Sequence, residues 1–179
     1  MANPYFWTYA GKCVHPLDPH PDEIAIADIA HALAHVCRFL GHTSLFYSVA
    51  QHSVLVSQQV PAADALWGLL HDASEAYICD LAAPIKRDPS MEAYRAAEER
   101  LMACVCRKFG LAPEMPESVK RADRVVLATE FRDVTTVNDL EWVAQECGVA
   151  PAPEFRVASC WASAFAEERF LARFEELTK

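Results

Sequence analysis

The sequence lacks the features that mark membrane, secreted and nucleic-acid-binding proteins. No apolar run reaches the ~18 residues that a membrane-spanning helix requires. The N-terminus has no charged segment followed by an apolar one, as a signal peptide would. No run of Lys and Arg exceeds two residues, and the formal net charge is −9. Neither nucleic acid nor a membrane is therefore expected as a partner, and we expect a cytoplasmic protein.

Glycine and paired cysteines are also scarce. Only 5 of the 179 residues are glycine, whereas 53% are hydrophobic, which indicates a compact globular chain. Domains usually contain roughly 100 to 200 residues, so a single domain over residues 1–179 is expected. The 7 cysteines are an odd number, and Cys104 and Cys106 do not have the spacing of a zinc ribbon. We expect reduced thiols in the core, and a homo-oligomer, dimer or larger, is compatible with the sequence.

Apolar periodicity and turn residues predict an all-α fold. Residues 1–25 should be irregular with a short hairpin around Ala10-Gly11, and their aromatic side chains should pack over the helical core or line the mouth of a site. Pro84 predicts a loop over residues 79–86, and Asn138 is expected to cap a helix that Gly148 closes. The helices are expected over residues 28–37, 46–60, 62–77, 88–109, 119–137, 138–148 and, as a C-terminal amphipathic helix, 154–179.

One predicted helical stretch, Leu69 to Tyr77, places three titratable residues in an apolar setting. With 3.6 residues per turn, Glu75 lies one turn beyond His71 and Asp72, so the three side chains can converge. A buried carboxylate without a partner costs several kcal/mol or becomes protonated, and a divalent cation bound by His71 and Asp72 removes that cost. The stretch therefore predicts the floor of a metal site.

Two further candidate ligands interrupt apolar helices elsewhere. His52 lies within the apolar run of residues 46–56, and Asp123 precedes Val125–Leu127. Each has a simpler interpretation, as a hydrogen-bonded core histidine or as a helix-capping aspartate. Together with His71 and Asp72 they give two imidazoles and two carboxylates, a set that suits one divalent ion such as Co, Mn, Fe, Ni, Zn or Mg.

The order His52, His71-Asp72, Asp123 on separate helices resembles the HD-domain metal-dependent phosphohydrolases. The chain is more similar to the branch typified by the bacterial 5'-deoxynucleotidase YfbR and by phage nucleotide phosphohydrolases. The resemblance implies an HD-domain helical bundle that hydrolyses a phosphoester, with Glu75 orienting or deprotonating water or protonating the leaving oxygen. It extends from about Ile26 to Asp133 and rests on segments 37–39, 48–53, 70–76, 80–86, 93–98 and 119–123.

The same resemblance implies a set of substrate-binding residues. Arg38 stands where this branch carries an arginine that contacts the substrate phosphate, and a guanidinium can pair with two phosphate oxygens at once. A surface arginine at a helix end is the simpler alternative. Asp80 matches an active-site aspartate of this branch, which implies a catalytic role, and Lys86 follows a proline that the branch shares, Pro84. The resemblance therefore assigns Asp80, Pro84 and Lys86 to substrate binding.

Two neighbours of Arg38 concern specificity. Phe39 stands where YfbR has tryptophan, and phenylalanine can stack but cannot donate an indole N–H, so ribose should be rejected less strictly. Gly41 leaves room for several bases. His42 is a second candidate for holding the phosphate, although a role as an ordinary loop histidine is equally compatible with the sequence.

His31 and His35 also have a metal-ligand spacing, four residues apart on one predicted helix. No glutamate follows His31 in the metalloprotease pattern, so core or capping roles are expected for both histidines.

The expected function is hydrolysis of a small-molecule nucleotide, releasing phosphate from (deoxy)nucleoside 5'-monophosphates. Cleavage of a deoxynucleoside triphosphate to triphosphate is the alternative within the same chemistry. A non-catalytic HD protein that binds a metal or a nucleotide as a sensor is the alternative of another class. A cyclic-nucleotide phosphodiesterase is less expected, because the additional histidine ligands for a second metal are not found in a helical context.

Overall fold

A helix that is buried on every side occupies the centre of the molecule. In the computed structural model, which describes residues 3–179, this is α2 (Val49–Gln58), and residues 49–57 are all buried. Around it lie α1 (Ile26–His35), α3 (Ala65–Leu70), α7 (Glu117–Val134) and α9 (Ser163–Thr178). A helix with no solvent-facing side shows no amphipathic pattern, which explains the even distribution of apolar residues along α2.

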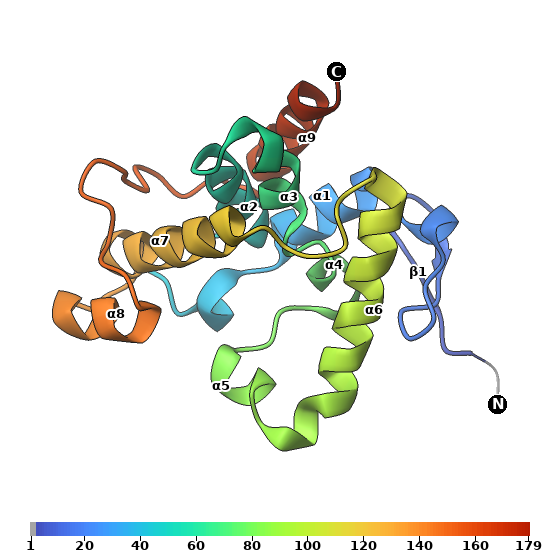
Figure 1. The fold of residues 1–179 in the computed structure, drawn as a ribbon, viewed down its shortest axis with the longest axis horizontal. Helices are drawn as coiled ribbons and strands as arrows, with labels where there is room; N and C mark the ends of the chain where they lie inside the picture. Colours follow the sequence, from blue (N-terminus) through green and yellow to red (C-terminus); the bar gives the residue numbers. More distant parts are fainter. Residues whose placement is uncertain (1–2) are drawn as a thin grey trace.

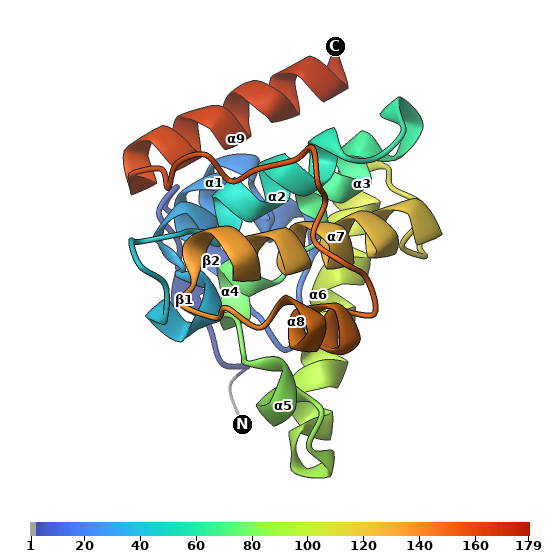
Figure 2. The ribbon, with the colours of Figure 1, turned by 90° about the vertical axis from the view of Figure 1, so that its left-hand side faces the viewer.

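The helices around α2 form layers that share one main core. Figure 2 shows α9 lying across α1 and α2 on one side, with α7 on the other. The long helix α6 (Glu92–Phe109) runs down one flank in Figure 1, next to α4 (Glu75–Ile78) and α5 (Ala83–Lys86). α8 (Leu140–Cys147) packs against α7 through a small cluster of Ala128, Val143 and Cys147. The main core joins side chains of α1, α2, α3, α6 and α9, among them Leu33, Val54, Leu69, Leu101 and Phe170.

The predicted all-α fold is confirmed. The only sheet among residues 3–179 is an antiparallel hairpin of β1 (Phe6–Trp7) and β2 (Cys13–Val14), in which Phe6 faces Val14. Short 3-10 helices cover Pro21–Glu23, Arg38–Gly41, Ala62–Asp64 and Pro89–Met91. None of the helices in this part of the chain combines the length and the hydropathy needed to cross a bilayer.

The hairpin lies where the sequence predicted it, but its aromatic residues do not cover the core. Tyr5, Trp7 and Tyr9 are 60%, 67% and 66% exposed. None of them lines the main cavity, a space of about 690 Å³ beside Arg38, Asp72 and Asp123. Two strands of two residues each offer too little surface to bury four aromatic rings. The expectation that they cover the core or line the mouth of the site predicted around His71 is therefore wrong.

Several helix ends differ from the predicted ones for reasons of capping. The central helix begins at Val49 rather than at residue 46 because the Ser48 hydroxyl accepts a hydrogen bond from the Gln51 amide. α8 is capped by Asp139, which accepts from Trp142 N at 2.9 Å, and not by Asn138. α9 begins at Ser163 rather than at residue 154, because residues 155–162 form no regular secondary structure. The remaining differences are small: α1 spans 26–35, α6 spans 92–109 and α7 spans 117–134.

Two predicted elements are divided differently. The helix expected over 62–77 is interrupted at residues 71–74, where the Ala73 amide bonds to Leu70 O and the Glu75 amide to Asp72 O, both at 3.0 Å. These tighter turns separate α3 from α4. The predicted loop over 79–86 contains α5, with Pro84 in its first turn, where the missing amide hydrogen costs nothing. Cys104, Cys106 and Cys147 are buried thiols as expected, but Cys79 is exposed.

Candidate metal centre and adjoining cavity

Four side chains from three parts of the bundle meet beside α2. His52 on α2 is fully buried, His71 ends α3, Asp72 lies in the turn that follows, and Asp123 is on the second turn of α7. The two Nε2 atoms of His52 and His71 lie 3.2 Å apart. The ligand atoms of His52, His71 and Asp72 all lie within 4.8 Å of one another. The structure thus brings together the histidines and the aspartate that the sequence singled out.

Asp123 joins this cluster from the opposite side. Its Oδ1 lies 3.1 Å from His52 Nε2 and 3.9 Å from His71 Nε2, while Asp72 Oδ2 lies 3.1 Å from His71 Nε2. Ligands that share one ion at ~2.1 Å lie roughly 3 to 3.5 Å from each other. These separations therefore fit a single ion, with Asp123 the more loosely placed ligand.

Hydrogen bonds on the far side of each ring fix which nitrogen faces the cluster. His52 Nδ1–H donates to Glu130 Oε1 at 2.7 Å, and His71 Nδ1–H donates to the Gly68 carbonyl at 2.8 Å. Both acceptors lack a proton to give, so each Nε2 is left with its lone pair directed into the cluster. Second partners of this kind orient the histidines that bind metals in proteins.

The charge of the cluster also fits a cation. Burial lowers the pKa of His52, but Glu130 and Asp123 outweigh it and raise that pKa to about 9. Burial also lowers the pKa of His71, but the charge and hydrogen bond of Asp72 outweigh burial and raise that pKa overall. Two lone pairs facing each other beside two carboxylates require a proton or a metal ion between them. The buried donor set can therefore hold one divalent ion.

Glu130 is a functional candidate that the sequence analysis missed. It is fully buried on α7, and its carboxylate accepts hydrogen bonds from Tyr47 OH at 2.7 Å, from His52 Nδ1 and from Arg38 Nε at 3.1 Å. Burial raises the pKa of Glu130, but the charges of Arg38 and His52 lower it overall. One carboxylate thus orients both a candidate ligand and the arginine beside it. Its spacing of seven residues from Asp123, two helical turns on the same face, is the signal that could have identified it.

Arg38 is held inside the molecule rather than at its surface. Its side chain is only 13% exposed, Nη2 lies 3.0 Å from Glu130 Oε2, and Nη1 lies 3.8 Å from Asp72 Oδ2. The alternative of a surface arginine at a helix end is therefore wrong. Because Nε and Nη2 bind Glu130, only the Nη1 edge faces the cluster.

Glu75 lies beside the cluster with its proton retained. Burial first, and then the charges of Asp72 and Asp80, raise the pKa of Glu75 to about 10. Its Oε2 is buried without a hydrogen-bond partner among residues 3–179. A cation bound by the neighbouring ligands would oppose this shift by favouring the carboxylate. The side chain can therefore donate a proton or accept one, depending on the charge beside it.

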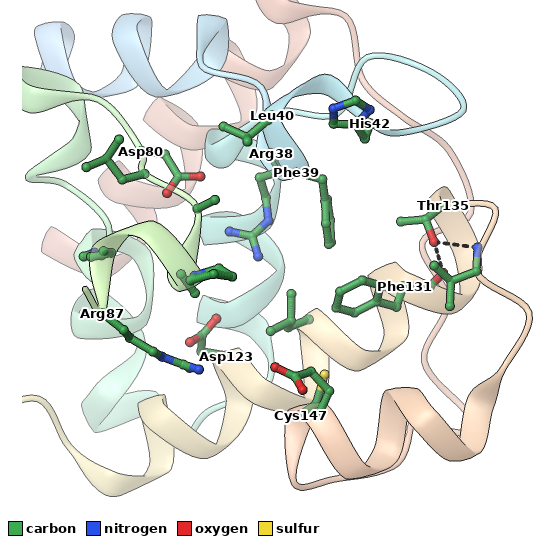
Figure 3. Close-up of a pocket in the computed structure, with 18 of the residues that line it drawn as sticks. Arg38, Phe39, Leu40, His42, Asp80, Arg87, Asp123, Phe131, Thr135 and Cys147 are labelled. Carbon is green, nitrogen blue, oxygen red and sulfur yellow. Dashed lines mark hydrogen bonds between the residues drawn. The ribbon is translucent and has the colours of Figure 1, made fainter.

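A cavity of about 690 Å³ opens onto the two aspartates of the cluster. Ligand pockets in proteins usually measure roughly 300 to 1,000 Å³. Figure 3 shows the Arg38 side chain extending into this cavity beside Phe39, with Asp123 on the α7 side. Most of the other residues that the sequence assigned to the site also line it, namely Glu75, His42, Asp80, Pro84 and Lys86, whereas His52 and His71 do not.

Other parts of the cavity are lined by residues that the sequence did not single out. Phe131 on α7 meets Phe39 edge-to-face with ring centroids 5.0 Å apart, and Trp142 on α8 meets Phe131 in the same way at 5.7 Å. Arg87, at the end of α5, adds a cation that forms no ion pair with any of residues 3–179. Lys86, by contrast, pairs with Glu98. The cavity therefore has a charged end and an aromatic end.

Unusual backbone conformations flank the cavity. Phe39 and Leu40 both have φ of 52°, and Cys79, just before Asp80, has φ of 67°. Phe39 and Leu40 are in the left-handed helical conformation, which costs a non-glycine residue roughly 1–2 kcal/mol. Cys79, with ψ of 160°, is in a region essentially limited to glycine, at a cost of roughly 1–3 kcal/mol. Three such residues next to Arg38 and Asp80 indicate that the surrounding structure holds these two side chains in place.

Comparison with known proteins places the chain among close relatives without adding an activity. No family model matches the sequence. The Escherichia coli (strain K12) protein named "Uncharacterized protein YfdR" is 42% identical over 172 residues, which cover 96% of this chain and 94% of the relative. A Rhodobacter capsulatus protein, also named as uncharacterized, is 39% identical over 122 residues, 63% of this chain and 62% of the relative. On the near-complete match to the first of these proteins, the chain belongs to the YfdR family.

Proposed function

We propose that this protein is a metal-dependent phosphohydrolase of the HD-domain type that removes the phosphate from (deoxy)nucleoside 5'-monophosphates. One observation carries the proposal. Two buried imidazoles and two partly exposed carboxylates, those of His52, His71, Asp72 and Asp123, form a cluster that opens through its carboxylates into a cavity that Arg38 also lines. Such a donor set beside a fixed cation suits an anionic substrate.

The residues of the site have separate roles in the proposed hydrolysis. A divalent ion held by the cluster would polarise a phosphoryl oxygen and make a nearby water a stronger nucleophile near neutral pH. Arg38, held by Glu130, directs Nη1 toward Asp72, where it can stabilise charge on the phosphoryl group. Glu75, which faces the same space, is suited to transferring a proton to the leaving oxygen.

The aromatic end of the cavity supports a nucleotide as the substrate class. Phe39, Phe131 and Trp142 offer ring faces and edges beyond Arg38, at which a base and sugar can pack. None of these rings except the indole carries a hydrogen-bond donor, so the base is contacted by shape more than by pairing. We therefore expect several bases to be accepted and ribose to be rejected only weakly.

A triphosphate substrate is supported by a separate observation. Arg87, which forms no ion pair with any of residues 3–179, and Lys86, which pairs with Glu98, lie on the α5 side of the cavity in addition to Arg38. A monophosphate needs one cation besides the ion, whereas a triphosphate chain can use several. Deoxynucleoside triphosphate triphosphohydrolase activity is therefore the second candidate function.

The test is the identity of the product. Protein stripped of metal and then loaded with Mn or Co would be incubated with a panel of ribo- and deoxyribonucleoside mono- and triphosphates. Phosphorus NMR, recorded after EDTA has removed the ion, would separate orthophosphate from triphosphate. The proposal predicts orthophosphate from several monophosphates and none after Asp123→Ala. Triphosphate from triphosphates alone would establish the second candidate instead.

A sensor without catalysis gives a different result. Such a protein would bind nucleotide and metal but release neither product from any member of the panel, and Glu75→Ala would change nothing. Binding measured by calorimetry together with absent turnover in the metal-loaded wild type would contradict the proposed function.

A further inference from the structure

A second cluster of metal-ligating side chains lies where α9 crosses α1. His31 and His35 are one turn apart on α1, and Glu167 is in the first half of α9. One ligand atom from each of the three lies within 4.8 Å of the other two. None of the three lines the main cavity, and none belongs to the cluster around His52. The hydrolytic site proposed above therefore leaves this group unused.

The His35 imidazole is oriented as metal-binding histidines are, while the His31 ring is held by its Nδ1 hydrogen bond to Glu167, in which an ion would take the place of the proton. His35 Nδ1–H donates to the His31 carbonyl at 2.7 Å, which leaves its Nε2 with a free lone pair. The ring of His31 stacks on Tyr9 of the hairpin, with centroids 3.7 Å apart and an angle of 4° between the planes. The expected capping role is confirmed for His35, whose Nδ1–H bonds a carbonyl of the last turn of α1, but its side chain is exposed and is not part of the core.

The separation of the ligand atoms also fits a shared ion. His31 Nδ1 and Glu167 Oε2 lie 2.9 Å apart. Two ligands at 2.0–2.1 Å from a tetrahedral ion are separated by roughly 3.3 Å, so both atoms can reach one ion with little movement. The side chains of His31 and Glu167 are 30% and 22% exposed, which leaves a path from solvent and room for a water ligand.

We propose that His31, His35 and Glu167 form a second divalent metal site that fastens α9 to α1. Two imidazoles and one carboxylate favour Zn, Ni, Co or Cu over Mg or Ca, because imidazole suits the later first-row metals. The site is structural rather than catalytic. α9 is preceded by the irregular segment of residues 149–162, so an ion shared with α1 adds a link near its N-terminal end (Figure 2).

The test compares ion content between the wild type and His35→Ala, in full-length protein stripped with EDTA and titrated with Zn or Ni. His35 is exposed, so its removal should leave the fold intact. The expected result is the loss of one equivalent of bound ion, measured by calorimetry and by elemental analysis after gel filtration. The count falls from two to one if the His52 cluster also binds, and from one to zero if it does not. The result is therefore independent of the proposed function.

Thermal unfolding supplies the second readout. At saturating Zn the melting temperature of the wild type should rise by about 5 °C more than that of His35→Ala. Glu167→Gln should weaken binding at this site by more than roughly tenfold, while His20→Ala, which removes an exposed histidine outside the cluster, should keep both the ion and the gain in melting temperature. Equal ion counts and equal gains in the wild type and His35→Ala would show that the three residues form only a hydrogen-bonded group and would overturn the proposal.

Discussion

At the scale of single residues, the candidate site depends on one buried carboxylate that binds no substrate. Glu130 holds the ring of His52 by its Nδ1 and the guanidinium of Arg38 by its Nε. The proposed metal ligand His52 and the arginine proposed to contact phosphate therefore share an anchor. Removing its charge should affect both, although neither residue changes.

The variant Glu130→Gln tests this link. The amide has the same volume as the carboxylate, but it gives Arg38 no negatively charged partner and is a weaker acceptor for His52. The affinity for Mn should therefore fall roughly 10- to 100-fold. Titration calorimetry on the stripped protein measures it. Glu117→Gln, an exposed glutamate on the same helix, is the matched control and should bind Mn as the wild type does. Equal affinities for the two variants would show that Glu130 does not support the ligand.

Glu75 gives a second prediction at this scale. Its raised pKa, caused by burial and by Asp72, means that a glutamine reproduces its hydrogen bonding but cannot transfer a proton. Glu75→Gln should therefore lower kcat by roughly 10²- to 10⁴-fold with unchanged Mn content. Steady-state kinetics and elemental analysis measure the two quantities. A variant that keeps full activity would remove Glu75 from the proton-transfer role.

At the scale of elements, the short 3-10 helix over Arg38–Gly41 is the most strained segment beside the cavity. Leu40 has φ of 52° and is 55% exposed, so it is held in a left-handed conformation without burying its side chain. Asparagine adopts this conformation more readily than leucine. The strain at this position can therefore be relieved by substitution.

Leu40→Asn should stabilise the protein by about 0.5–1 kcal/mol, since the left-handed conformation costs leucine about 1–2 kcal/mol. Urea unfolding measures the change. Leu45→Asn replaces a leucine that is 67% exposed and has no positive φ, and as an exposed position it should stay within roughly 0.5 kcal/mol of the wild type. A shift of the same size and sign in both variants would mean that the backbone strain is not the cause.

A second element, the irregular segment of residues 149–162 before α9, is tied to α7 by Asp133. Its carboxylate accepts from Arg132 Nε at 2.7 Å and from Val157 N at 2.9 Å. Burial raises the pKa of Asp133, but these bonds and Arg132 lower it overall. A carboxyl whose folded pKa lies below its unfolded value stabilises the fold above the unfolded value, and this contribution is lost as the pH falls through the folded pKa.

Asp133→Asn should therefore cost about 1–3 kcal/mol of stability at pH 7, the cost of weakening charged hydrogen bonds. The difference from the wild type should shrink as the pH falls below ~4, where the unfolded carboxyl is protonated. Urea unfolding at several pH values measures it. Glu154→Gln, at an exposed position in the same segment, should show no such pH-dependent loss; a constant difference for Asp133→Asn would contradict the assignment.

At the scale of the whole molecule, the all-α fold could be predicted from apolar periodicity and turn residues. The apolar pattern also marked His52, His71, Asp72 and Asp123 as candidate ligands, but that the four meet was predicted from their order, which resembles the HD-domain motif. Glu130 was not recognised because a helical glutamate usually faces water, and its partner Arg38 lies 92 residues away. The positions of Phe131 and Trp142 in the cavity could not be predicted, because tertiary packing decides which faces of α7 and α8 point toward it. The break at residues 71–74 was missed because its turns keep the apolar spacing of a helix.

The central claim is that one divalent ion is bound where α2, the turn after α3 and α7 meet. A crystal structure of the Mn- or Zn-loaded protein, with anomalous scattering recorded at the metal edge, tests it most directly. The account predicts one strong anomalous peak about 2.0–2.2 Å from the Nε2 atoms of His52 and His71 and from carboxylate oxygens of Asp72 and Asp123. A metal-loaded crystal with no peak there, and with the two imidazoles turned away from each other, would contradict it.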